Sequence, residues 1–299
     1  MTGRDRREDY RRARVCSAEP VSPSLMRIRF GGDELRGFAA TGHADQRVII
    51  ALPSPGEDEP TPPVTVDGSR GYPDGTRCPE LRSYTVRDWD PRHGELVVDF
   101  ALHAAGVATE WARRARAGAV VYVHADTGWY RPPADTAWRL LVADLAGLPA
   151  LARIVETLPA GARAHVLAEV PESADVQRWR CAADLSVQWL VGSGNGVGPS
   201  ALTGAVRALA LPASPCYVWS AAEAGIARTI RKHARTSWHL AASRFDIIGY
   251  WRAEQEAWLA RYRSVEARME ELWTAGIRDG KSEDDVIDML DDALEQAGL

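Results

Sequence analysis

The sequence predicts an antiparallel β-barrel, followed by a parallel-sheet α/β domain and a helical tail. Roughly the first 130 residues hold short segments of alternating or β-branched residues between turns rich in proline and glycine, which is typical of a barrel. From Trp138 onward, strand-like and helix-like segments alternate, which indicates a parallel sheet. A length of 299 residues suits two domains. We therefore expect a barrel domain over 1–133, an α/β domain over 134–252 and a tail over 253–299.

The individual elements follow from local patterns. The strands predicted in the barrel are Leu25–Phe30, Arg47–Leu52, Arg82–Arg87, Glu95–Leu102 and Ala119–His124, with a long loop at Pro53–Pro79. In the second domain the predicted strands are Trp138–Asp144, Arg163–Val170, Cys216–Ser220 and Phe245–Tyr250. The predicted helices there are Leu148–Leu158, Ala201–Leu211 and Ala222–Arg235. Tyr130–Ala137 is the expected linker between the domains.

The tail carries two apolar stripes at helical spacing. The first stripe is Trp258, Tyr262, Val265, Met269 and Leu272, and the second is Val286, Leu290, Ala293 and Ala297. Gly276 and Gly280 are expected to break the helix between them, and Ser282 with Asp285 resembles a capping box with Asp in place of the usual Glu. We expect two helices packed on their own chain, with the acidic charge on the outer face. A homodimer contact through the tail is the alternative.

Composition excludes several classes of protein. The formal net charge is −5, and no basic face typical of nucleic-acid binding is visible. No apolar run approaches the roughly 20 residues of a membrane span, and the charged N-terminal stretch lacks the apolar core of a secretory signal. Four separated cysteines without a CxxC pair argue against disulfides and metal sites and fit the cytoplasm.

The most informative motif is Arg82-Ser83-Tyr84-Thr85 in a predicted strand. Arg82 and Tyr84 would share one face of the strand, and Thr85 would point to the other. A flavin needs this set of groups, because a guanidinium suits its pyrophosphate, a flat ring suits the isoalloxazine and a hydroxyl suits the N5 edge. An exposed strand with an Arg/Tyr pair is the alternative interpretation.

A second motif follows at a spacing that suits one dinucleotide. The strand Glu95–Leu102 leads through His103 into a turn of small residues, Ala104-Ala105-Gly106, and then into a helix that begins Val107-Ala108-Thr109. Small residues let a phosphate approach the backbone, and the free N–H groups at a helix N-terminus bind anions. The alternative is an ordinary connection between a strand and a helix.

Taken in order, six segments resemble the siderophore-interacting, FAD-binding flavoproteins, a branch of the ferredoxin-reductase-like superfamily. The resemblance covers residues 12–252 and is carried by RSYTVR (82–87), VDFALH (98–103), GVATEWA (106–112), LPALARIVETLP (148–159), YVWSAAEA (217–224) and GYWR (249–252). It implies FAD, NAD(P)H and a small-molecule substrate such as a ferric siderophore. The residues it implies for FAD are Arg82, Ser83, Tyr84, Thr85, Asp99, His103, Gly106, Val107, Ala108 and Thr109. It places the nicotinamide near Asp144 and Glu223, and the substrate near Trp251 and Arg252.

The chain departs from this family at three places. Leu145-Ala146 stands where the family has Glu-Thr, the turn 125–128 lacks an arginine, and the strand at 48–50 lacks a lysine. Two functions therefore stay open. One is a reductase that passes electrons from NAD(P)H through FAD to a ferric chelate. In this interpretation the reduction of the flavin by the nicotinamide is expected to be slow or absent. The other is a repurposed pocket that acts without redox chemistry on a small molecule of a biosynthetic pathway.

A further glycine-rich stretch, Gly192–Gly198, lies between a strand and a helix. Its spacing is not GxGxxG, and no acidic residue closes a strand about 20 residues later, as that fingerprint requires. We expect a flexible loop.

Overall fold

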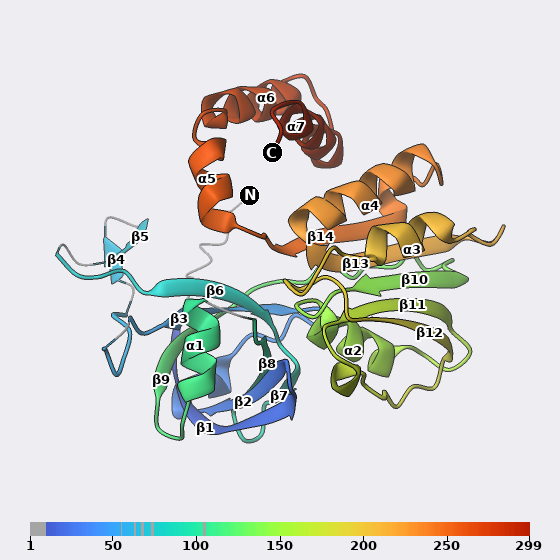
Figure 1. The fold of residues 1–299 in the computed structure, drawn as a ribbon. Coiled ribbons are helices and arrows are strands. Elements are labelled where there is room, and N and C mark those ends of the chain that lie inside the picture. Colours follow the sequence, from blue (N-terminus) through green and yellow to red (C-terminus); the bar gives the residue numbers. More distant parts are fainter. Residues whose placement is uncertain (1–9, 55, 63, 67–68, 73–74, 104–105) are drawn as a thin grey trace, which may run out of the picture.

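The barrel predicted for the N-terminal part is present as a curled antiparallel sheet (Figure 1). The structure is a computed structural model that describes residues 10–54, 56–62, 64–66, 69–72, 75–103 and 106–299. The strand order in this sheet is β6-β3-β9-β1-β2-β8-β7, and each strand is antiparallel to its neighbours. Strand β6 also contacts β8. They are β1 (Arg11–Ser22), β2 (Leu25–Gly31), β3 (Arg47–Leu52), β6 (Glu80–Thr85), β7 (Asp88–Asp90), β8 (Glu95–Ala101) and β9 (Val120–Ala125). A hairpin of β4 (Val64–Val66) and β5 (Ser69–Gly71) interrupts the long loop.

An aromatic core joins this sheet to helix α1 (Val107–Arg114). Trp111 of α1 stacks on Phe30 of β2, with ring centroids 6.3 Å apart, and also contacts Phe100 of β8. Burying large rings of this kind stabilises the fold by roughly 1.5–3 kcal/mol each. The packing therefore fixes the start of α1 beside the end of β8, where the sequence predicts a dinucleotide.

The second sheet has five parallel strands in the order β12-β11-β10-β13-β14. They are β10 (Trp138–Ala143), β11 (Arg163–Val170), β12 (Asp184–Val191), β13 (Cys216–Glu223) and β14 (Phe245–Trp251). One face packs on α2 (Leu148–Thr157), and the other packs on α3 (Leu202–Ala208) and α4 (Ala224–Thr236). This doubly wound order changes direction between β10 and β13, the point where such sheets bind ligands at the carboxyl ends of their strands.

The predicted strands match observed ones to within a few residues, but the longest strand of the barrel was missed. β1 has only two fully buried positions, Ala13 and Val15, among arginines and other partly exposed residues. Its pairing with β2 and β9 comes from the rest of the sheet, so its own side chains show no clear alternation. No helix in the described part of the chain is both long and apolar enough to cross a membrane.

The prediction of two tail helices was wrong, because the structure has three. They are α5 (Gln255–Tyr262), α6 (Glu266–Arg278) and α7 (Glu283–Gln296). A tight turn interrupts the first apolar stripe: the Ser264 hydroxyl donates to the carbonyl of Arg261, and the Val265 N–H donates to the carbonyl of Tyr262.

The two tail glycines have different roles. Gly276 does not break the helix, since it lies inside α6, where a Cβ would stand 2.6 Å from Cγ2 of Val286 in α7. Gly280, with φ of 76°, lies in the turn that follows α6 and separates it from α7. The predicted cap is confirmed, because the Ser282 hydroxyl accepts from the Asp285 N–H.

The tail is fastened to its own chain mainly through charge. Asp291 of α7 pairs with both Arg228 and Arg231 of α4, while Asp288 and Glu295 pair with Arg235 and Lys232. The expectation that the acidic charge stays on the outer face was therefore wrong for these residues. The sequence suggested apolar packing, but α4 presents a row of cations that needs partners. Figure 1 shows α7 beside α4.

Candidate cofactor and substrate site

Strand β6 places the Arg-Ser-Tyr-Thr motif at the edge of the curled sheet. Arg82 is exposed, and its Nη1 lies 2.7 Å from Oε2 of Glu80 on the same face of the strand. Ser83 is exposed as well. Tyr84 is half-buried and packs on Phe100, with ring centroids 4.1 Å apart. The strand thus keeps a cation and a supported ring on one face, as the alternation of the sequence predicts.

Thr85, the next residue, is buried, and its hydroxyl has no hydrogen bond partner among the described residues. The hydroxyl of Tyr250 in β14 is likewise buried and unpartnered within the described chain. Burial raises the pKa of Tyr250, and an interaction with the Thr85 hydroxyl opposes this rise, so the two hydroxyls are neighbours. Buried hydroxyls normally have partners, so this pair between the two sheets fits the polar edge of a bound ring.

The start of α1 is open to an anion. Gly106 is its N-cap with φ of 140°, no side chain of the described residues caps the helix, and a Cβ at Gly106 would stand 2.7 Å from Cε1 of His103. The Thr109 hydroxyl turns back to accept from the His103 N–H at 3.5 Å. His103 is exposed, Ala108 and Thr109 are buried, and Val107 is half-buried. Ala104 and Ala105, which the sequence places in this turn, lie outside the described residues. This backbone suits the approach of a phosphate.

Asp99, also implied for FAD, is engaged elsewhere. Its carboxylate is buried and accepts from Nε and Nη2 of Arg27 at 2.7 and 2.8 Å. This bidentate pair joins β8 to β2 and occupies both oxygens of the carboxylate.

Asp144 lies at the carboxyl edge of the parallel sheet, as the sequence predicts, and fastens three strands there. Oδ1 accepts from the N–H groups of Ala146 and Gly147 at 2.9 and 3.1 Å. Oδ2 accepts from the Glu223 N–H at 2.9 Å and from Nε1 of Trp251 at 2.6 Å. Burial raises the pKa of Asp144 to about 6, and the hydrogen bonds from Trp251 and the backbone act against that rise.

Glu223 is the N-cap of α4 rather than a free carboxylate after the strand. Its Oε2 accepts from the N–H groups of Gly225 and Ile226, and its Oε1 accepts from the N–H of Ala253. The two acids implied for the nicotinamide thus shape the edge of the site by holding backbone in place.

The residues implied for the substrate lie at the end of β14, where Trp251 is its last residue and Arg252 follows it. Trp251 is held by Asp144, and the Arg252 guanidinium lies 3.8 Å from the ring centroid of Trp258 in α5. A cation on an aromatic face is stabilised by the ring quadrupole. The first tail helix therefore covers one side of Arg252, a contact that the sequence did not reveal.

Arg47 is a cation that sequence reasoning missed. It precedes the positions where a lysine is absent, pairs with Asp126 at 2.6 Å and stacks 3.8 Å from the ring centroid of Trp129. Arg47 stands one position before residues 48–50, so the absence of a lysine there does not reveal it. Leu145, the apolar substitute in the first turn, is buried in the core.

The stretch Gly192–Gly198 is a loop and not a fingerprint, as predicted, but its anchors were not predicted. Oε1 of Glu169 accepts from the hydroxyls of Ser193 and Ser200 and from the N–H of Ala201. Asn195 accepts from the N–H of Leu145 at 3.0 Å. The loop is thus tied to the same carboxyl edge as Asp144.

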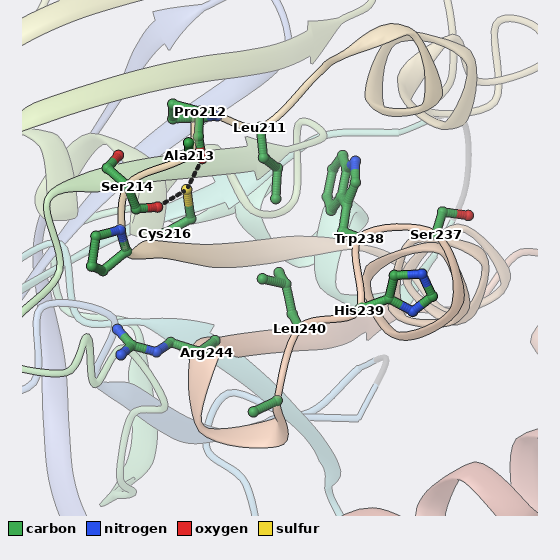
Figure 2. Close-up of a pocket in the computed structure, with 12 residues that line it drawn as sticks. Leu211, Pro212, Ala213, Ser214, Cys216, Ser237, Trp238, His239, Leu240 and Arg244 are labelled. Carbon is green, nitrogen blue, oxygen red and sulfur yellow. Dashed lines mark hydrogen bonds between the residues drawn. The ribbon is translucent and has the colours of Figure 1, made fainter.

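A pocket of about 640 Å³ lies at the opposite, amino edge of this sheet. Figure 2 shows Leu211, Trp238 and Leu240 around it, with the Cys216 thiol donating to the Ser214 carbonyl at 3.1 Å. Because doubly wound sheets bind ligands at the carboxyl ends of their strands, this pocket is separate from the candidate site.

Two family models match the chain. The model described as "Siderophore-interacting FAD-binding domain" matches residues 14–128, and the one described as "Siderophore-interacting protein" matches residues 136–254. The chain is 29% identical to the NADPH-dependent ferric-chelate reductase of Escherichia coli, over 82% of this chain and 94% of that protein. It is 27% identical to the ferric vibriobactin reductase ViuB of Vibrio cholerae, over 78% of this chain and 85% of that protein.

Solved structures agree with these matches. A siderophore utilization protein from T. fusca superposes with a TM-score of 0.73 at 28% identity, covering 82% of this chain and 94% of that one. The siderophore-interacting protein SipS from Aeromonas hydrophila gives 0.71 at 28% identity, covering 87% and 99%. A ferredoxin reductase of carbazole 1,9a-dioxygenase, at 14% identity and a TM-score of 0.57, covers 81% and 70% and shares the fold.

Proposed function

Because the chain belongs to the siderophore-interacting FAD-binding family, we propose that it is an FAD-dependent oxidoreductase that passes electrons from NAD(P)H to the iron of a ferric siderophore or a similar small chelate. The observation that carries the FAD assignment is the buried Thr85 hydroxyl, which lies near the Tyr250 hydroxyl and meets no partner at hydrogen-bond geometry in the described chain. When bound, FAD supplies hydride acceptance and one-electron transfer, chemistry that protein side chains lack.

The protein's own groups bind and orient. Arg82, which pairs with Glu80, would offer its guanidinium to the pyrophosphate, and the N-terminus of α1 would offer backbone N–H groups to the same charge. Tyr84 supplies a ring that Phe100 supports from behind. The hydroxyls of Thr85 and Tyr250 would hydrogen bond the polar edge of the flavin ring.

The substrate side is weakly cationic. Arg252 stacks on Trp258, and Arg47 is already paired with Asp126, so the edge carries few free positive charges for an anionic ferric chelate. We infer a substrate recognised partly through aromatic surface. The non-redox alternative has no support from the relatives, whose printed names describe reductases.

The spectrum of the purified, FAD-loaded protein tests this function. We expect a flavin absorbance that bleaches under nitrogen when NADH or NADPH is added, and that returns when a ferric chelate follows. Bleaching slower than the ordinary turnover range of roughly 1–100 s⁻¹ would fit the loss of the polar pair at Leu145 and Ala146. A flavin that neither nucleotide reduces would argue for the non-redox pocket.

Arg82→Ala is expected to weaken FAD binding by about 1.5–3 kcal/mol, or about 10- to 150-fold in Kd, because a charge-assisted bond to the pyrophosphate is lost. Fluorescence titration of the apoprotein with FAD measures this. Arg116→Ala removes the same charge from an exposed position after α1 and serves as the control. Equal Kd values for the two variants would contradict the assignment of Arg82.

A further inference from the structure

Glu169 has a buried carboxylate oxygen that the fold leaves unused. The side chain is fully buried near the end of β11. Its Oε1 accepts three hydrogen bonds from the loop after β12, while its Oε2 has no partner in the described chain. A buried carboxylate oxygen without a donor costs folding free energy, which points to a second role for this group.

The position of Glu169 in the sheet suggests that role. The turn Asp144–Gly147 follows β10, the first strand of the doubly wound sheet, and β11 is the next strand, parallel and adjacent to it. Glu169 comes 22 residues after Gly147 (169 − 147). In sheets of this order, an acidic residue about 20 residues beyond the first turn hydrogen bonds the ribose 2′-hydroxyl of NAD, whereas an arginine nearby accommodates the 2′-phosphate of NADP.

The segments directly after β11 and β12 are not basic. Segments 170–177 and 190–206, which follow β11 and β12 at this edge, contain neither lysine nor arginine. Segment 170–177 adds the acids Glu172 and Asp175. The next basic residues in the sequence are Arg178, Arg180 and Arg207, which follow these segments, so a phosphate directly at the end of β11 would lie nearer to acids than to bases.

The loop that covers Glu169 holds a matching donor. Nδ2 of Asn195 is buried and without a partner among the described residues, and the Gly194 backbone lies against Oε2, where a Cβ would stand 1.9 Å away. Gly192, Gly194 and Gly196 all have positive φ, a backbone conformation that residues other than glycine rarely adopt. The unused acceptor lies against Gly194, and the unused donor belongs to the next residue of the chain, so the two groups fit the hydroxyls of a ribose.

We infer that Glu169 is a specificity-determining residue, and that its free oxygen selects NADH over NADPH by accepting from the ribose 2′-hydroxyl and repelling a 2′-phosphate. This inference rests on the proposed function, since it concerns the dinucleotide of that same site. It separates the chain from the E. coli relative, whose printed name states dependence on NADPH.

Calorimetric titration of the FAD-loaded protein with NAD⁺ and with NADP⁺ tests this without relying on turnover. We expect wild type to bind NAD⁺ at least about tenfold more tightly. Glu169→Gln should bring the two Kd values to within about threefold of each other, since the charge that rejects the phosphate is gone. Asp184→Asn removes one charge from a side chain that is 80% exposed at the opposite edge of the sheet, and Ser193→Ala loosens the loop while keeping the carboxylate. Both controls should keep the wild-type ratio.

Tighter or equal binding of NADP⁺ by wild type would overturn the inference, and so would a ratio that Glu169→Gln leaves unchanged or that Ser193→Ala changes as much. In those cases both nucleotides still bind, so the proposed function stands. Binding of neither nucleotide would overturn both.

Discussion

Asp144→Asn is expected to lower the free energy of unfolding by about 2–4 kcal/mol at pH 7. The carboxylate of Asp144 accepts from four donors in a buried position, and an amide keeps one acceptor oxygen while turning an NH₂ group toward two of these donors. Urea denaturation measures the change. Asp184→Asn, at a side chain that is 80% exposed, is the control and should change stability by less than about 0.5 kcal/mol. Equal losses would show that Asp144 does not hold the strand ends.

The same group gives a pH dependence with a defined sign. Its pKa is raised from 3.8 to about 6 in the folded state, so the folded protein holds the proton more tightly than the unfolded chain does. The stability that this proton contributes is therefore fully present below about pH 4 and is lost as the pH rises toward about 6. Between about pH 4 and pH 6 the wild type should therefore lose roughly 2 kcal/mol of stability relative to Asp144→Asn. A difference that is flat from pH 4 to pH 6.5 would contradict it.

Gly147→Ala is the second change with a large expected effect. A Cβ at Gly147 would stand 2.2 Å from the carbonyl oxygen of Ala221 and 2.8 Å from its Cβ, and the backbone of β13 cannot move away cheaply. We expect a loss of about 2–4 kcal/mol in the free energy of unfolding, because overpacking here separates the start of α2 from the sheet.

Gly204→Ala is the matched control for that change. Gly204 lies inside α3 with nothing near its missing Cβ, so alanine should stabilise the protein by about 0.5–1 kcal/mol through helix propensity. The two substitutions are chemically identical and should have opposite signs in urea denaturation. The same sign for both would show that the contact at Ala221 relaxes at little cost.

The sequence predicted those parts of the fold that local pattern determines. The sequence predicted β10 and β11 because their apolar runs are short and bounded, and it predicted β8 because that segment contains β-branched residues. β1 could not be recognised, since its partners in the sheet and not its own side chains define it. The division of the tail into α5 and α6 was hidden because Val265 continues the apolar spacing through the turn.

The site was predicted in position more than in contacts. Asp144 was expected at the carboxyl edge of the sheet, where it lies. Its partners Glu223 and Trp251 stand 79 and 107 positions away in the sequence, so no local pattern shows that its oxygens are occupied. Glu169 was overlooked because the acidic residue was sought after the glycine-rich loop and not after the turn at Gly147.

The fastening of α7 to α4 has a consequence for biosynthesis. Arg231 and its partner Asp291 are separated by 60 positions, and the same helix bonds the carbonyl of the last residue, Leu299, through Arg228. At translation rates of about 5–20 residues per second, the cations of α4 wait roughly 3–12 s before their acidic partners are made. The nascent protein therefore passes through an interval in which the cationic face of α4 lacks its acidic partners.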